Sequence, residues 1–308
     1  MRPLDFSAPT SLADALRLLG GDSALLCGGT DLIIQMRAGR RDVGHMVDVK
    51  KIPELNVLEF DPVKGLRLGA AVACMTLGEF QPAVRHYPGL VEGAELIGST
   101  QIQGRASVGG NLCNGSPAAD SVCGLIVLNA VCVVEGSKGR REIEAKDFMT
   151  GPGKTALRPD ELLVEIRVPV PARRSSSAYL RFIPRNEMDI AVAGAAASVT
   201  LADDGKTVRA AIVAIGAVGP TPLLVPGAAT ALLGKPVDEA SLAEAAAAAS
   251  AAAQPISDVR GPADYRRHMA GLLTRQAIVI AAERAGGKGP APVGRGHLTG
   301  NGNGRARS

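Results

Sequence analysis

Two pairs of adjacent glycines, far apart in the sequence, constrain this chain more than any other feature. The first pair, Gly28-Gly29, follows the short apolar run of residues 24–27 and precedes Thr30-Asp31. Glycine lets the backbone turn with positive φ and lets a ligand approach backbone N–H groups closely. The segment predicts a buried strand that turns into a helix near Thr30-Asp31, where free N–H groups suit a phosphate. Taken alone, an ordinary strand–turn–helix connection explains it more simply.

The second pair, Gly109-Gly110, lies in residues 107–120, a segment that is rich in small polar side chains. Ser116 is expected to cap a helix that starts at Pro117, with Asp120 near the end of its first turn. Packing alone does not require so many tight turns and small polar groups, so a binding function is favoured here. Because neither a G-x-G-x-x-G motif nor a P-loop is present, the two doublets predict one diphosphate clasped by two separate loops.

Candidates for acid–base or metal chemistry are scarce. The four histidines are His45, His86, His268 and His297, and none has a metal-ligand spacing or a neighbouring nucleophile. Asp31 and Asp120 could act as general bases, although Asp at a helix start often serves as a cap. We therefore predict no catalytic residue and no metal ligand. A chain of this kind suits redox chemistry that is carried by a bound cofactor.

Composition narrows the possible partners and the compartment. The net charge of +4 comes from four basic residues beyond position 285, and without them 30 basic residues face 30 acidic ones. A chain with no Trp, three Tyr and five Phe offers little base-stacking surface, so nucleic acid is not an expected partner. The five cysteines form no C-x-x-C pair, which favours free thiols and a reducing compartment. With no signal stretch or membrane-spanning run, a cytoplasmic protein is expected.

Patterns along the chain predict an α+β protein with three units. We expect an α/β unit at residues 1–56, an α+β unit at 57–172 and a sheet-and-helix unit at 178–285, followed by a disordered, Gly-rich basic tail at 286–308. In the third unit a hairpin turn is expected at residues 203–205. Two helices should follow it, at residues 241–253 with a capping box that starts at Ser241, and at residues 262–284.

Residues 27–32 and 107–120, in this order and spacing, resemble the FAD-binding medium subunit of the xanthine dehydrogenase and carbon monoxide dehydrogenase family, the molybdenum hydroxylases. The resemblance covers roughly residues 1–284. It implies a two-part FAD-binding domain of the PCMH or vanillyl-alcohol-oxidase-like type, followed by a small C-terminal domain of antiparallel sheet and helices. The chain lacks the cysteine-rich insertion of relatives that reduce 4-hydroxybenzoyl-CoA, which argues against that branch.

The resemblance also implies which residues bind FAD. The first segment would wrap the pyrophosphate and the ribityl chain, and the second would form the other half of the clasp. Relatives often have Lys at position 181, near the flavin, where this chain has Arg. The implied FAD-binding residues are Leu25, Leu26, Cys27, Gly28, Gly29, Thr30, Asp31, Leu32, Ile97, Ser107, Gly109, Gly110, Asn111, Asn114, Asp120, Leu163 and Arg181.

The family pattern implies an electron-transfer role. Substrate would be oxidised at a molybdenum cofactor in a large subunit, and electrons would cross two [2Fe–2S] clusters of a small subunit to this FAD. The acceptor could be NAD, oxygen, a quinone or a dye, and the substrate is chosen by another polypeptide. Two alternatives stay open: a free-standing FAD-dependent oxidoreductase that acts directly on a small substrate, and a non-redox protein that keeps only the fold.

Overall fold

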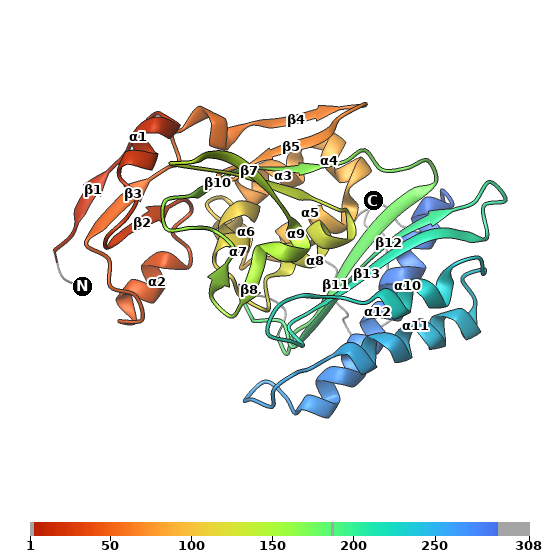
Figure 1. The fold of residues 1–308 in the computed structure, drawn as a ribbon. Coiled ribbons are helices and arrows are strands. Elements are labelled where there is room, and N and C mark those ends of the chain that lie inside the picture. Colours follow the sequence, from red (N-terminus) through yellow and green to blue (C-terminus); the bar gives the residue numbers. More distant parts are fainter. Residues whose placement is uncertain (1–2, 186–187, 289–308) are drawn as a thin grey trace.

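Three β-sheets follow one another along the chain (Figure 1). The computed structural model describes residues 3–185 and 188–288. The first sheet is parallel, with the strand order β1-β3-β2, and helix α2 makes the crossover between β2 and β3 that parallel neighbours require. The elements of this unit are β1 (Asp5–Ser7), α1 (Leu12–Arg17), β2 (Ser23–Leu26), α2 (Leu32–Arg37) and β3 (His45–Asp48).

The second sheet is antiparallel, with the strand order β4-β5-β10-β6-β7. Its strands are β4 (Leu58–Asp61), β5 (Gly65–Gly69), β6 (Val131–Gly136), β7 (Gly139–Glu144) and β10 (Leu162–Val168). The short helical elements of this unit are η1 (Pro53–Asn56), α3 (Cys74–Glu79), α4 (Gln81–His86), α5 (Pro88–Glu95), α6 (Thr100–Gln103), α7 (Val108–Cys113), α8 (Asp120–Val127) and α9 (Ala145–Phe148). A two-stranded ribbon of β8 (Met149–Gly151) and β9 (Lys154–Thr155) completes it.

The third sheet is antiparallel and is covered by long helices (Figure 1). Its strands are β11 (Ser175–Phe182), β12 (Ala193–Leu201), β13 (Val208–Gly216) and β14 (Leu223–Leu224), and its helices are α10 (Pro226–Leu232), α11 (Glu239–Ala252) and α12 (Ala263–Ala285). The predicted hairpin joins β12 to β13, and the predicted last helix is α12. The sheet-and-helix architecture that the sequence predicts for this part is confirmed.

Small residues let α12 pack closely on the third sheet. Strand β12 turns Ala193, Ala195 and Ala197, all of them buried, toward the core that it shares with α12. The facing helix contributes Ala270, Ala277 and Ala281, which are fully buried as well. Because few aromatic side chains are available, tight packing of small aliphatic groups replaces the bulky side chains of other cores.

The second and third units share buried contacts. Tyr179 of β11 belongs to the main hydrophobic core of the second unit, together with Ala196 and Ala214. The backbone N–H of Tyr179 donates to the buried carboxylate of Glu92 on α5 at 2.8 Å, and Arg284 near the end of α12 donates to the same carboxylate at 2.6 Å. Helix α5 of the second unit is therefore joined to β11 and α12 of the third unit by polar contacts as well as by apolar packing.

Three local predictions are wrong in detail. Residues 108–113 form helix α7, so Gly109-Gly110 lie in the first turn of a helix and not in an open loop. Helix α8 starts at Asp120, because residues 116–119 form a turn and Ala119 is the N-cap. The capping box of α11 runs from Asp238 to Ser241, three residues earlier than predicted, because Asp238 accepts the backbone N–H of Ser241.

Residues 289–308, most of the predicted tail, lie outside the described residues. Within the described part of the chain, no helix has both the length and the apolar character needed to cross a membrane.

Candidate functional site

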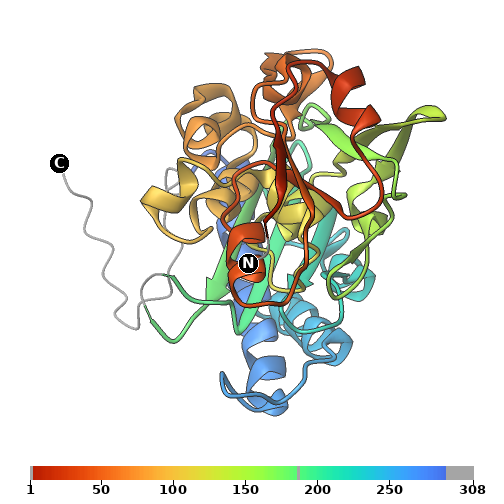
Figure 2. The same cartoon turned by 90° about the vertical axis from the view of Figure 1, so that its left-hand side faces the viewer.

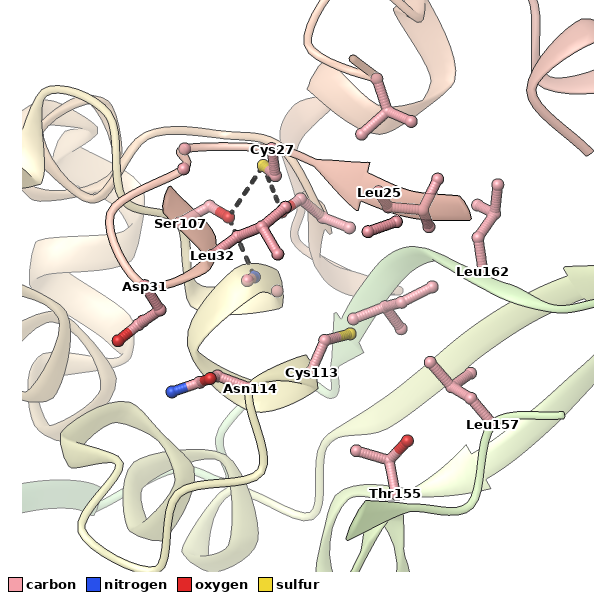
Figure 3. Close-up of a pocket in the computed structure, with 18 of the residues that line it drawn as sticks. Leu25, Cys27, Asp31, Leu32, Ser107, Cys113, Asn114, Thr155, Leu157 and Leu162 are labelled. Atoms are coloured by element: carbon pink, nitrogen blue, oxygen red, sulfur yellow. Dashed lines mark hydrogen bonds between the residues drawn. The ribbon is translucent and has the colours of Figure 1, made fainter. Parts of the chain in front are cut away.

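A cavity of about 790 Å³ lies between the two glycine segments (Figure 3). Gly28 and Gly29 line it from the first segment, and Gly109 and Gly110 line it from the second. Residues that precede β10 close a further side. Small-molecule and cofactor sites commonly have volumes of about 300–1,000 Å³. The two doublets therefore share one cavity of cofactor size.

The first glycine segment presents backbone donors to the cavity. Gly29 has a φ of 78°, a conformation that side chains other than hydrogen rarely allow, and here the chain leaves β2 and turns toward α2. Within the described chain, the N–H groups of Gly28, Gly29 and Thr30 have no hydrogen-bond acceptor. Backbone N–H groups without partners are uncommon inside proteins, and a row of them suits an anionic ligand.

The second segment is organised by Ser107, the N-cap of α7. Its side-chain oxygen accepts the backbone N–H of Gly110 at 3.0 Å, and its side chain is buried. Further along α7, the side-chain oxygen of Asn111 accepts the hydroxyl of Ser121 at 2.7 Å. Asn114 ends the helix and lines the cavity. Amide groups of this kind offer N–H donors to a polar ligand.

Direct contacts hold the two segments together. The Sγ atom of Cys27 lies 3.3 Å from the Oγ atom of Ser107 (Figure 3). A Cβ atom on Gly28 would lie 2.4 Å from the carbonyl oxygen of Arg105, and one on Gly109 would lie 2.5 Å from that of Ala70. These glycines are needed for close backbone packing, in addition to any role in ligand approach.

Most of the residues predicted to bind the cofactor line this cavity. They are Leu25, Cys27, Gly28, Gly29, Thr30, Asp31, Leu32, Ile97, Ser107, Gly109, Gly110, Asn111, Asn114 and Leu163.

Leu26, Asp120 and Arg181 do not line the cavity. Strand alternation turns Leu26 to the opposite face from Leu25, into a small apolar core. Asp120 and Arg181 are buried behind the cavity, where a nitrogen of Arg181 lies 2.6 Å from the Asp120 carboxylate. A buried guanidinium needs a counter-charge, so Arg181 contacts Asp120 instead of the cavity.

Burial controls the protonation of Asp120. Desolvation raises the pKa of the Asp120 carboxyl to about 6, while Arg181 and the hydroxyl of Tyr179, which donates to Asp120 at 2.9 Å, oppose this rise. A carboxyl group with this pKa is ionised at neutral pH and becomes protonated in mild acid. The ion pair with Arg181 is therefore sensitive to pH.

A third wall of the cavity, which was not predicted, comes from the β8–β9 ribbon and the residues that follow it. No glycine doublet or polar motif marks it in the sequence, and only the fold brings it next to the other two segments. The lining residues that were missed include Gly153, Thr155, Leu157, Arg158, Glu161 and Leu162, together with Gln35, Arg40 and Arg41.

The charges around the cavity favour an anionic ligand. Three arginines, Arg40, Arg41 and Arg158, line it alongside two carboxylates. Glu161 is buried and is paired with Arg141 at 2.7 Å and with Arg158 at 3.5 Å, and these arginines lower the pKa of Glu161. Burial raises the pKa of Asp31, whose carboxylate points away from Leu25 and from Leu162.

Two of the described histidines, His45 and His86, have structural contacts. His45 is hydrogen-bonded to Ser7 at 2.8 Å, and the ring of His86 stacks on Phe60. Neither of these nor His268 lines the cavity, and His297 lies outside the described residues. Among the residues that the structure describes, no group of three or more His, Cys, Asp or Glu side chains could hold a metal ion.

The fold and the cavity together suit a protein that binds a large anionic ligand between a small parallel unit and an antiparallel unit. Two family models match the chain. One describes the FAD-binding domain in molybdopterin dehydrogenase and matches residues 2–171, and the other describes the C-terminal domain of the CO dehydrogenase flavoprotein and matches residues 178–281. The chain therefore belongs to the family of FAD-binding proteins of molybdopterin dehydrogenases.

Individual relatives match along nearly the whole chain. The carbon monoxide dehydrogenase medium chain of Hydrogenophaga pseudoflava is 34% identical over 91% of this chain and 97% of the relative. A putative xanthine dehydrogenase FAD-binding subunit of Escherichia coli is 32% identical over 90% and 96%. Among solved structures, reconstituted CO dehydrogenase from Oligotropha carboxidovorans contains a chain that is 33% identical, with a TM-score of 0.87 and coverage of 92% and 99%.

These matches confirm the resemblance noted in the sequence and the predicted fold. The protein is an FAD-binding subunit of the carbon monoxide and xanthine dehydrogenase type of molybdenum hydroxylase. The residues of the cavity fit this cofactor, because N–H groups without partners at Gly28, Gly29 and Thr30 suit a diphosphate. Apolar residues such as Leu25, Leu157 and Leu162 supply a surface for a flat ring system.

Proposed function

We propose that FAD binds in this cavity with its diphosphate against the N–H groups of Gly28, Gly29 and Thr30. The second segment, from Ser107 to Asn111, would close over the other side. The observation that carries this proposal is that the free backbone donors and the second glycine doublet line one cavity. Bound FAD supplies one- and two-electron redox chemistry. The residues of the chain bind it, orient it and limit the access of water.

The proposed contacts are the predicted residues that line the cavity. Asn114 would donate to a polar part of the cofactor, and Ile97 and Leu163 would pack against its apolar parts. We assign Asp120 and Arg181 a supporting role, because they lie behind the cavity and contact each other. Arg158, which was not predicted, lies on the third wall, where it and Arg141 both pair with Glu161.

We further propose that the chain passes electrons between partner proteins. Electrons would arrive from the [2Fe–2S] clusters of a small subunit, after oxidation of the substrate at molybdenum in a large subunit. They would leave to an external acceptor such as NAD, oxygen or a quinone. The names of the relatives, a medium chain and an FAD-binding subunit, support a place in a larger complex.

A free-standing flavin enzyme remains the second candidate, because Asp31 is a carboxylic acid at the cavity with a raised pKa. Direct oxidation of a small substrate needs a proton acceptor or donor beside the reacting atoms. The Asp31 carboxylate points away from the apolar surface formed by Leu25 and Leu162, where a ring system would pack. Electron transfer between subunits therefore agrees better with the site.

Flavin fluorescence tests the binding proposal directly, because flavin absorbs visible light and no amino-acid side chain does. We expect the fluorescence of added FAD to change on binding and the melting temperature of the protein to rise. Riboflavin, which lacks the diphosphate, should bind much more weakly. Failure of the chain to bind FAD would overturn the proposal.

Alkylation of Cys27 locates the bound cofactor. Cys27 is partly exposed at the cavity, whereas Cys74 and Cys132 are fully buried. Mass spectrometry should show that FAD slows the reaction of Cys27 with iodoacetamide, while Cys74 and Cys132 stay unreactive with and without FAD. Equal rates at Cys27 with and without FAD would place the cofactor elsewhere.

Gel filtration tests the electron-transfer role. Co-expression with the products of neighbouring genes should give a stable complex that contains molybdenum and iron–sulfur clusters. A chain that stays alone and oxidises a small substrate would support the second candidate. We also propose a cytoplasmic location, which the five free thiols support because disulfides are rare in reducing compartments.

A further inference from the structure

Gln35 on helix α2 forms a side-chain contact between the two halves of the cavity. Its Nε2 atom donates to the Oδ1 atom of Asn114, the residue that ends α7, at 2.9 Å. Both side chains line the cavity and are partly buried. The contact joins the helix that follows the first glycine doublet to the helix that carries the second.

The hydrogen bond fixes the direction of the Asn114 side chain. An amide has one oxygen that accepts and one nitrogen that donates, so an Asn whose oxygen is occupied presents its nitrogen elsewhere. Within the described chain, the Nδ2 atom of Asn114 has no hydrogen-bond partner. In Figure 3 this nitrogen lies on the Asp31 side of Asn114 and points away from Cys113, Thr155 and Leu157.

We infer that Gln35 is a positioning residue, which holds Asn114 so that its amide donates to the ligand. The donor would face an acceptor group, such as a phosphate or hydroxyl oxygen of FAD, between the two glycine segments. This inference rests on the proposed function. Gln35 belongs to no sequence motif.

Two substitutions of Gln35 distinguish the effect of its hydrogen bond to Asn114 from the effect of its side-chain volume. Gln35→Met keeps the size of the side chain but removes the donor, so Asn114 becomes free to rotate, and FAD should bind about fivefold to tenfold more weakly. Gln35→Glu offers only an acceptor, so Asn114 should turn its nitrogen to Glu and its oxygen to the ligand. We expect a larger loss of FAD affinity from Gln35→Glu than from Gln35→Met.

Gln103→Met is the matched control. The Gln103 side chain donates to the carbonyl oxygen of Glu95 at 2.5 Å and does not line the cavity. Gln103→Met therefore removes a comparable hydrogen bond away from the cavity. This variant should leave the dissociation constant of FAD, measured by flavin fluorescence, unchanged.

A double-mutant cycle with Asn114→Ala decides whether Gln35 acts through Asn114. If it does, Gln35→Met should have almost no further effect once Asn114 has been removed. Losses that simply add, or a Gln35→Met variant that binds FAD like the unchanged protein, would overturn the inference. Failure of the unchanged protein to bind FAD would instead overturn the proposed function, so the two failures are distinguishable.

Discussion

At the scale of single residues, the glycine doublets serve packing as much as ligand approach. The sequence suggested that glycine was present to let a ligand reach the backbone. In the structure, Gly28 lies directly against the backbone of Arg105, and Gly109 lies against Ala70. Gly28 therefore brings the two halves of the cavity into contact, and Gly109 lets α7 pack against the end of β5.

Replacement of Gly109 tests this packing. A Cβ atom at Gly109→Ala would collide with the backbone of Ala70, so the variant should lose about 1–3 kcal/mol of unfolding free energy and bind FAD less tightly. Gly104→Ala is the control. A Cβ atom there would lie 3.6 Å from its nearest neighbour, the carbonyl oxygen of Gln101, and the φ of Gly104 is −65°. Equal stability of the two variants in urea unfolding would contradict the packing role.

Asp120 gives a second prediction at this scale. Its pKa is raised from 3.8 to about 6, so the folded protein holds this proton more tightly than the unfolded chain does. The resulting stabilisation is fully present below pH 3.8 and is lost as the pH rises through about 6. We expect the unfolding free energy of the unchanged protein, relative to Asp120→Asn, to fall between pH 4 and pH 6.5 and then level off. A relative stability that rises over this interval would show that Arg181 dominates.

At the scale of elements, short helices carry the cavity and depend on their caps. Helix α7 spans only Val108–Cys113, and Ser107 both caps it and contacts Cys27 of the first segment. Helices this short gain little stability from their own hydrogen bonds, so their position depends on capping and tertiary contacts. One hydroxyl thus links the start of α7 to the other half of the cavity.

Ser107→Ala tests this link. Loss of the cap should cost about 1 kcal/mol of unfolding free energy, and FAD should bind more weakly because α7 is no longer fixed. Ser11→Ala removes a cap of the same kind from α1, where the Ser11 oxygen accepts the N–H of Asp14. The control should lose similar stability but keep its FAD affinity. Equal FAD dissociation constants for the two variants would show that the Ser107 cap does not shape the site.

At the scale of the whole molecule, the third sheet and its helices are fastened to α5 of the second unit by buried charges. Arg284 donates to Glu92 at 2.6 Å and to the carbonyl oxygen of Ser177 at 2.9 Å; Glu92 is buried and the Arg284 side chain is 9% exposed. Figure 2, which shows the molecule turned by 90°, also places the third sheet and its helices beside the other two units. The C-terminal part is therefore joined to the FAD-binding part by more than a linker.

Substitution of Arg284 tests how much this ion pair contributes to the stability of the protein. Arg284→Met leaves the Glu92 carboxylate buried without its main counter-charge, so unfolding free energy should fall by about 3–5 kcal/mol. Arg275→Met removes an arginine from an ion pair with Glu239 that is largely exposed, and should cost less than about 1 kcal/mol. Thermal unfolding of both variants checks the difference. A small effect of Arg284→Met would mean that apolar packing alone holds the units together.

Features with a local physical cause could be predicted from the sequence. The run of residues 24–27 and the glycines after it predicted β2 and the turn to α2, because a short apolar run that ends in glycine is typical of a buried strand followed by a turn. The hairpin at residues 203–205 and helix α12 followed from turn chemistry and apolar spacing in the same way. Errors in detail, such as the start of α8, arose where Ser116 and Pro117 fitted a helix start equally well but form a turn.

The sequence by itself determined the two glycine doublets, the polar residues that follow them and the shortage of catalytic side chains, because each is a property of local composition. Only the tertiary structure decided which residues meet. It added the wall at residues 153–162 and Gln35 to the cavity, and it turned Arg181 to Asp120. The physical reason is that contacts between distant segments depend on backbone packing and on the neutralisation of buried charge, and neither can be read from neighbours along the chain.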